Sequence, residues 1–161
     1  MCKGDGWFLV NARDVRWRES KGRGASSNFG GDTLFDQLGV GITIVGPGEP
    51  TTMYHWESNE EDFIVLRGGG VAILDGEEHR LRQWDYLHCP PGTAHITIGA
   101  GEEPCALLMA GTRAADATIR YLVEPAAAAY GASVETESTS PREVYADRPP
   151  IEPTRSPWPL S

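Results

Sequence analysis

Cysteine is scarce in this chain of 161 residues, and the three present, Cys2, Cys89 and Cys105, show no C-x-x-C spacing. An odd number without that spacing argues against a disulfide framework and against a zinc site built from thiolates. Long hydrophobic runs are also missing, because no stretch approaches the roughly eighteen apolar residues of a membrane span. The charged N-terminus, MCKGDGWFLV, lacks the apolar core of a secretory signal. We therefore expect a reduced, cytoplasmic protein.

Basic residues are outnumbered, with 14 lysines and arginines against 23 aspartates and glutamates. The resulting net charge of −9 repels both phosphate backbones and anionic lipid headgroups. The N-terminal region is also too short and too glycine-rich for a helix-turn-helix module. These features argue against nucleic acid and membrane surfaces as partners, and they leave a small molecule as the expected one.

Long amphipathic helices are the third absence, and short strand-like segments take their place. Segments rich in Val, Ile, Leu, Thr and Phe recur at short intervals, broken by Gly, Pro, Asp and Asn. One of them, GVAILDGEEHRLR, resembles a hairpin with DGEE at its turn. This pattern predicts an all-β antiparallel sandwich or barrel. The expected strands span 39–45, 51–57, 62–67, 70–76, 79–82, 85–89, 94–99, 105–113 and 118–123.

The chain divides into three regions. Residues 1–32 form an N-terminal arm, in which KGRGASSNFGGD is predicted to be loop. Residues 33–123 form the β-barrel. Residues 124–161 begin with one short helix at PAAAAYGA (125–132) and continue as a tail whose proline density is expected to forbid regular structure. That tail is either disordered or an extended strap lying on the body or on a partner.

Ionisable side chains concentrate around two strand ends. His55 and Glu57 are two residues apart in an expected strand, so they project to the same face. Glu61 begins the next strand, and His95 follows the Pro-Pro-Gly turn of WDYLHCPPGTAH. Two imidazoles and two carboxylates can thus converge at one end of the barrel. Burying them without a partner is costly, and a divalent cation is the obvious partner. His88, in the strand before the turn, is expected to be packed or hydrogen-bonded instead.

At these positions the chain resembles the cupin family. The first motif of that family runs G, about five residues, HxH, three or four residues, E, six residues, G. It matches here at Gly48, His55, Glu57, Glu61 and Gly68, with one extra residue after the first glycine and a glutamate in place of the second histidine. The second motif matches at Trp84, Pro90, Gly92, His95 and Gly99, where Trp84 and Gly99 replace the usual Gly and Asn.

The resemblance implies a double-stranded β-helix, or jelly-roll barrel, with a divalent transition metal near its centre. Iron, zinc, nickel and manganese all accept such ligands. Carried over position by position, the matched metal ligands are His55, Glu61 and His95. Because small cupins are commonly dimers, the resemblance also implies a homodimer.

Two roles are open for Glu57. As a fourth ligand it would bring the charge of two neutral histidines, two carboxylates and a divalent ion to about zero. Off the metal, it would leave His55, Glu61 and His95 as a set of two histidines and one carboxylate with free coordination positions, which suits non-haem iron(II). Glu57 could then serve as the general base, particularly if burial beside another carboxylate raises its pKa.

Strand parity predicts the lining of the substrate pocket. Met53 shares the face of His55, Phe63 and Val65 share that of Glu61, and Thr97 shares that of His95. These residues predict a mostly apolar mouth suited to a small organic molecule, although core packing explains them equally well. The expected function is a metalloenzyme of dioxygenase, isomerase or lyase type. The alternative is a non-catalytic cupin that binds a metal or small molecule.

Overall fold

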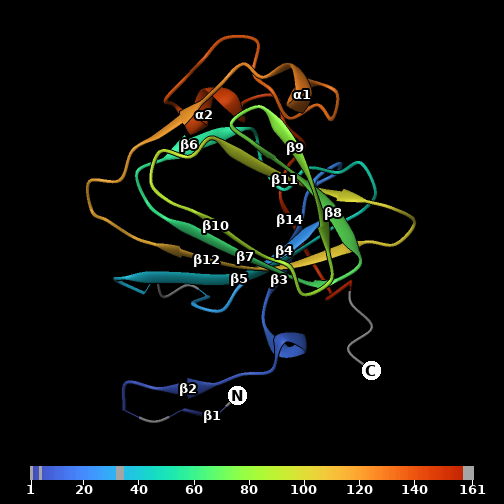
Figure 1. The fold of residues 1–161 in the computed structure, drawn as a ribbon. Helices are drawn as coiled ribbons and strands as arrows, with labels where there is room; N and C mark the ends of the chain where they lie inside the picture. The colour runs from blue at the N-terminus through green and yellow to red at the C-terminus, as the bar shows by residue number, and fades with distance from the viewer. Residues whose placement is uncertain (1, 4, 32–34, 158–161) are drawn as a thin grey trace.

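The computed structural model describes residues 2–3, 5–31 and 35–157, and its body consists of two β-sheets that face each other (Figure 1). Neighbouring strands run antiparallel in both sheets. The larger sheet holds, in spatial order, β10 (Tyr86–Cys89), β7 (Glu61–Arg67), β12 (Cys105–Thr112), β5 (Leu38–Val45), β4 (Ala25–Asn28), β3 (Trp17–Glu19) and β14 (Glu152–Thr154). The smaller sheet holds β13 (Ile119–Tyr121), β6 (His55–Glu57), β11 (His95–Ala100), β8 (Gly69–Leu74) and β9 (Glu77–Arg82).

The predicted all-β jelly-roll architecture is confirmed. Its interior lies between the sheets, where alternate residues of β5, β7 and β12 meet in a cluster of Val45, Val65, Cys105 and Leu107. Parts of the outer faces are covered as well. Both faces of β11 are buried, because His95 and Thr97 point into the barrel while Ile96 and Ile98 pack outward under the C-terminal region. The side chains of this strand therefore alternate, with the polar His95 and Thr97 facing the interior and Ile96 and Ile98 in the outer apolar cluster.

The predicted hairpin is also confirmed, with β8 and β9 joined at Asp75 and Gly76. Both residues have positive φ, 47° and 85°, as a two-residue type I′ turn requires. The strand predicted at 51–57 is shorter than expected, because β6 covers only His55–Glu57. Tyr54 instead donates its backbone N–H to the carbonyl of Ala132, outside the sheet.

The loop prediction within the N-terminal arm is wrong at Ala25–Asn28, which form β4. These residues have weak β-propensity, but they pair with Gly41–Ile44 of β5 and bury Ala25 and Ser27. Tertiary pairing thus overrides local preference. Before them lie a hairpin of β1 (Cys2–Lys3) and β2 (Phe8–Leu9), which projects from the body in Figure 1, and a 3-10 turn at Ala12–Asp14.

Residues 125–157 of the C-terminal region form a strap on the body, one of the two arrangements expected. The predicted short helix is present as α1 (Pro125–Ala128). The prediction that proline forbids regular structure beyond it is wrong. Helix α2 (Pro141–Val144) places its proline at the first turn behind a Ser140 cap, and β14 places Pro153 on a sheet edge. Both positions tolerate a missing N–H group. None of the helices in the described ranges is long and apolar enough to cross a membrane.

Candidate metal centre

Strand pairing brings the predicted ligands together. His55 begins β6 and His95 begins β11, and the two residues are direct partners across these antiparallel strands. Glu61 begins β7 in the opposite sheet and points toward them across the barrel. Both histidines are buried, at 6% and 3% exposure. Three elements from two sheets therefore contribute one side chain each to the same point.

The three side chains are close enough to share one metal ion. Glu61 Oε2 lies 2.9 Å from His95 Nε2 and 3.8 Å from His55 Nε2. One ligand atom from each residue lies within 4.8 Å of the others, and His55, Glu61 and His95 are the group that satisfies this condition within the described ranges. The two imidazole centroids are 4.8 Å apart and their planes are tilted by 51°.

The backbone fixes how each imidazole presents its nitrogens. His55 Nδ1 donates to the carbonyl of Met53 at 2.7 Å, and His95 Nδ1 donates to the carbonyl of Thr93 at 2.9 Å. Carbonyl acceptors at Nδ1 leave Nε2 of each ring as the coordinating atom. Both Nε2 atoms face Glu61, so the donor set fits a divalent transition metal: two neutral imidazoles and one carboxylate.

The charge states of the cluster follow from its burial. Burial and the neighbouring His95 lower the pKa of His55, which keeps that ring neutral. Burial also opposes charge on His95 and Glu61, yet contacts with Cys89 and Glu61 raise the pKa of His95 to about 10. The hydrogen bond from His95 in turn lowers the pKa of Glu61. Without a metal, His95 and Glu61 thus form an ion pair, whose shared proton a cation would displace.

Glu57 lies beside this cluster but outside the three-residue group. Its carboxyl is half-buried and hydrogen-bonded to that of Glu61. Burial, followed by repulsion from Glu61, raises the pKa of Glu57 to about 7. A carboxyl group with this pKa exchanges protons readily near neutral pH. Glu57 thus lies beside the ligand group and not within it, and its role as ligand or base stays a prediction.

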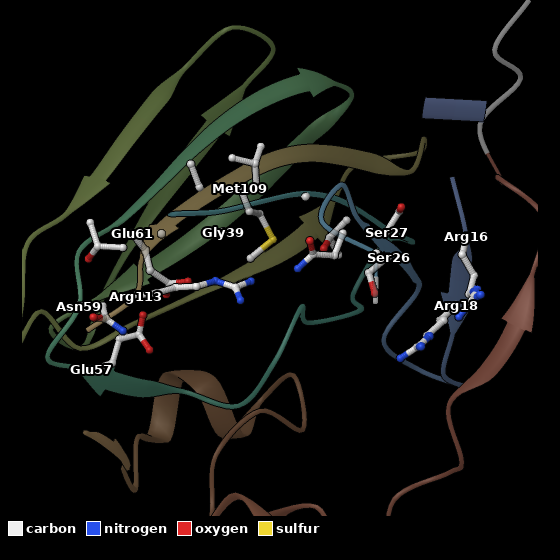
Figure 2. Close-up of a pocket in the computed structure, with 18 residues that line it drawn as sticks. Arg16, Arg18, Ser26, Ser27, Gly39, Glu57, Asn59, Glu61, Met109 and Arg113 are labelled. Atoms are coloured by element: carbon white, nitrogen blue, oxygen red, sulfur yellow. The ribbon is translucent and has the colours of Figure 1, made fainter. Parts of the chain in front are cut away.

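Glu57 and Glu61 lie on the wall of a cavity of about 540 Å³ at the mouth of the barrel (Figure 2). In Figure 2 the two glutamates and Asn59 lie at one end, while Arg16 and Arg18 of the N-terminal arm lie at the other. The lining of this cavity carries more polar side chains than the mostly apolar mouth that strand parity predicts. Its lining includes Arg16, Arg18, Ser26, Thr43, Asn59 and Arg113. The cause is the unforeseen position of β3 and β4, which add their polar side chains to the rim.

The four predicted pocket residues lie deeper than this cavity, and within the described chain none of them is part of its lining. Phe63 presents its ring at 5.7 Å to that of His95, and Val65 packs in the interior cluster. Thr97 is hydrogen-bonded to Thr51 at 3.0 Å. Met53 is buried and contacts two arginines through its sulfur. A substrate contact with these residues stays a prediction.

His88 behaves as predicted, because its Nδ1 is hydrogen-bonded to Asp62 at 2.7 Å on the surface. Sequence reasoning missed the arginines of the cavities, which come from the N-terminal arm, the end of β12 and the C-terminal strap. Their positions lie outside both motifs, and no periodic pattern marks them. Only the pairing of β3, β4 and β14 brings these segments to the barrel.

Comparison with known proteins agrees with this fold. Residues 41–111 match the family model described as Cupin domain. An uncharacterized protein of Methanocaldococcus jannaschii is 31% identical over 65 residues, which are 40% of this chain and 52% of that protein. The chain thus spans about half the length of this curated relative.

Two solved structures cover most of the chain. A sugar phosphate isomerase of the cupin superfamily from Silicibacter pomeroyi shares 21% identity over 93% of this chain and 83% of its own, with a TM-score of 0.56. The polyketide cyclase RemF from Streptomyces resistomycificus shares 15% identity over 91% of this chain and 84% of its own, with a TM-score of 0.57. Identities this low show a shared fold and carry no information on the reaction.

Proposed function

We propose that the protein is a metal-dependent enzyme of isomerase or lyase type acting on a small organic molecule, a proposal supported by the match of residues 41–111 to the Cupin domain. In this proposal His55, Glu61 and His95 hold a divalent transition metal, and Glu57 is the general base. The observation that carries it is the Glu57 carboxyl, which has a pKa of about 7 and lies beside a ligand on the cavity wall.

The proposed chemistry is proton transfer at carbon. A bound metal supplies Lewis acidity, which makes a C–H bond next to a carbonyl more acidic. Glu57 accepts that proton and, in an isomerisation, returns it at a neighbouring atom. In a lyase reaction the neighbouring bond breaks instead, and Glu57 passes the proton to the leaving group. The polar rim, with Asn59 and Arg113, orients a hydrophilic substrate and not an apolar one.

A second candidate is oxygen chemistry with iron(II). It is favoured by the donor set itself, since two histidines and one carboxylate with free positions suit non-haem iron. The two candidates differ in what they consume. An isomerase or lyase needs no oxygen, whereas an oxygenase takes up oxygen with each turnover.

The test is a screen of hydroxy-ketone and keto-acid compounds, carried out in D₂O with metal-loaded protein. Deuterium incorporation at carbon, followed by proton NMR, reports the proposed proton transfer, and an oxygen electrode monitors the second candidate. Glu57→Gln is expected to keep the metal and to lower the exchange rate by about 10²–10⁴-fold. A metal-loaded wild type that neither exchanges deuterium nor consumes oxygen would overturn both candidates and favour the non-catalytic alternative.

A further inference from the structure

Two arginines from distant parts of the chain converge on one sulfur atom. Arg23 Nη2 lies 3.1 Å from Met53 Sδ, and Arg148 Nη2 contacts the same sulfur. A thioether is a neutral and weak acceptor. It cannot compensate two guanidinium charges, so this arrangement places two cations together without a matching negative charge.

No carboxylate compensates them within the described ranges of the chain. Neither Arg23 nor Arg148 has an acidic oxygen within 4.0 Å there, and Arg23 Nη1 is buried without a hydrogen-bond partner. Both guanidinium groups lie over the ring of Tyr145, at 5.8 and 4.5 Å from its centroid. Burial lowers the pKa of Arg23, as expected for a cation lacking an anion. Leaving such a charge unpaired is costly.

The two arginines border a cavity of about 490 Å³ under the C-terminal strap. Ser20, Thr51 and Thr52 also line it, but their hydroxyl groups are already hydrogen-bonded within the protein, and Glu19 is its acidic member. Arg18, Ser26, Thr43 and Met109 line both this cavity and the one that holds Glu57 and Glu61. The two spaces are therefore neighbours that share a wall, and one elongated molecule can occupy both.

The arginines are also linked to the metal centre through two residues. Met53, which both guanidinium groups contact, accepts the hydrogen bond of His55 Nδ1 through its carbonyl. Tyr145 packs edge-on against Tyr121 at 5.7 Å, and Tyr121 lies 5.8 Å from the ring of His55. One layer of side chains thus separates the arginines from a ligand.

We propose that Arg23 and Arg148 form an anion subsite that binds the carboxylate or phosphate group of the substrate. The guanidinium fork matches both groups with paired, charge-assisted hydrogen bonds. The anion binds in the cavity under the strap against the two guanidinium groups, and the reacting part of the molecule extends past Thr43 and Met109 toward Glu57. The placement of the reacting part rests on the proposed function, whereas the anion subsite does not depend on it.

The test measures binding of inorganic phosphate and of succinate by isothermal titration calorimetry, with the metal-loaded and the metal-free protein. The variants are Arg23→Gln and Arg148→Gln, and Arg148→Lys retains the charge without the fork. Arg142→Gln is the matched control, because this arginine is exposed on the same strap and lines neither cavity. Circular dichroism confirms folding of each variant.

We expect at least one of the two anions to bind the wild type with a roughly millimolar or tighter Kd. Arg23→Gln and Arg148→Gln should weaken it at least about tenfold, and Arg148→Lys should weaken it less. Arg142→Gln should leave it unchanged. Tighter binding of phosphate would identify a phosphate group on the substrate, and tighter binding of succinate would identify a carboxylate. Absence of binding to the wild type, or equal binding to Arg148→Gln and Arg142→Gln, would overturn the subsite. Anion binding by a wild type that takes up no metal would refute the proposed function alone.

Discussion

Glu57 carries an energetic cost when it ionises. Its pKa rises from an ordinary value of 4.5 to about 7, because burial and Glu61 disfavour the charged form. Between these two values the folded protein binds more protons than the unfolded chain. The contribution of Glu57 to stability is therefore present at low pH and is lost as the pH rises to about 7.

Glu57→Gln removes this dependence from the metal-free protein. The variant should unfold with the same free energy as the wild type near pH 4.5, and it should be more stable by about 1–2 kcal/mol above pH 7, a value reduced for solvent screening. Denaturant unfolding across this pH range measures the difference. A difference that stays constant with pH, or that has the opposite sign, would show that Glu57 ionises without cost.

His55, Glu61 and His95 are predictable from the sequence, since spacing within each motif follows from strand and turn lengths. The role of Glu57 cannot be predicted from the sequence, because it depends on which of the two carboxylates, Glu57 or Glu61, lies nearer both imidazoles. Arg23 and Arg148 are likewise invisible in the sequence. They are 125 positions apart in the numbering (148 − 23), and they meet only because the strap folds back on the N-terminal strands.

The strap depends on Tyr145 for its attachment to the barrel. The tyrosine packs against Tyr121, and its hydroxyl accepts a hydrogen bond from the backbone of Met53 at 3.3 Å. At the far end of the strap, β14 pairs with β3. Between these anchors, Arg148 is held half-buried, whereas Arg142 is exposed.

Tyr145→Ala should release the strap and leave the barrel folded. Trypsin is then expected to cleave after Arg142, in helix α2 of the strap, at least about tenfold faster than in the wild type, since local opening of the helix exposes the Arg142–Glu143 bond. Mass spectrometry of a digestion time course gives the rates. Tyr86→Ala, at a tyrosine that is 62% exposed, is the matched control and should not change them. An unchanged cleavage rate after Arg142 in Tyr145→Ala would rule out this anchoring role.

Strands of the barrel can be predicted from the sequence because segments rich in Val, Ile and Leu are separated by residues that favour turns. The exceptions share a physical cause. Ala25–Asn28 and Glu152–Thr154 have poor strand composition and become strands only by adding to an existing edge. Long-range pairing of this kind leaves no periodic signal in the segment itself.

The chain as a whole is strongly acidic, but arginine side chains gather around the two cavities at the barrel mouth. The net charge is −9, yet Arg16, Arg18 and Arg113 line one cavity and Arg23 and Arg148 the other. The buried cluster of ionisable groups beneath them is unfavourable without a cation. Metal binding should therefore stabilise the entire fold.

After treatment with chelator, the wild type should melt about 5–10 °C lower than with metal at about a hundred times its Kd. Differential scanning calorimetry measures this shift. His55→Ala should show no shift with metal, while His88→Ala, at the surface, should show the full one. A shift of equal size in His55→Ala would place the stabilising metal elsewhere.

The most direct test of the metal centre is elemental analysis by plasma mass spectrometry on protein purified without chelator. Wild type and His88→Ala should each contain about one mole of transition metal per mole of chain, because the three-residue group provides one site. His95→Ala should contain almost none, since this substitution removes one of the two histidine ligands. Equal metal content in His95→Ala and wild type, or a wild type that stays empty even after anaerobic reconstitution with iron(II), would contradict the assignment of His55, Glu61 and His95 as a metal site.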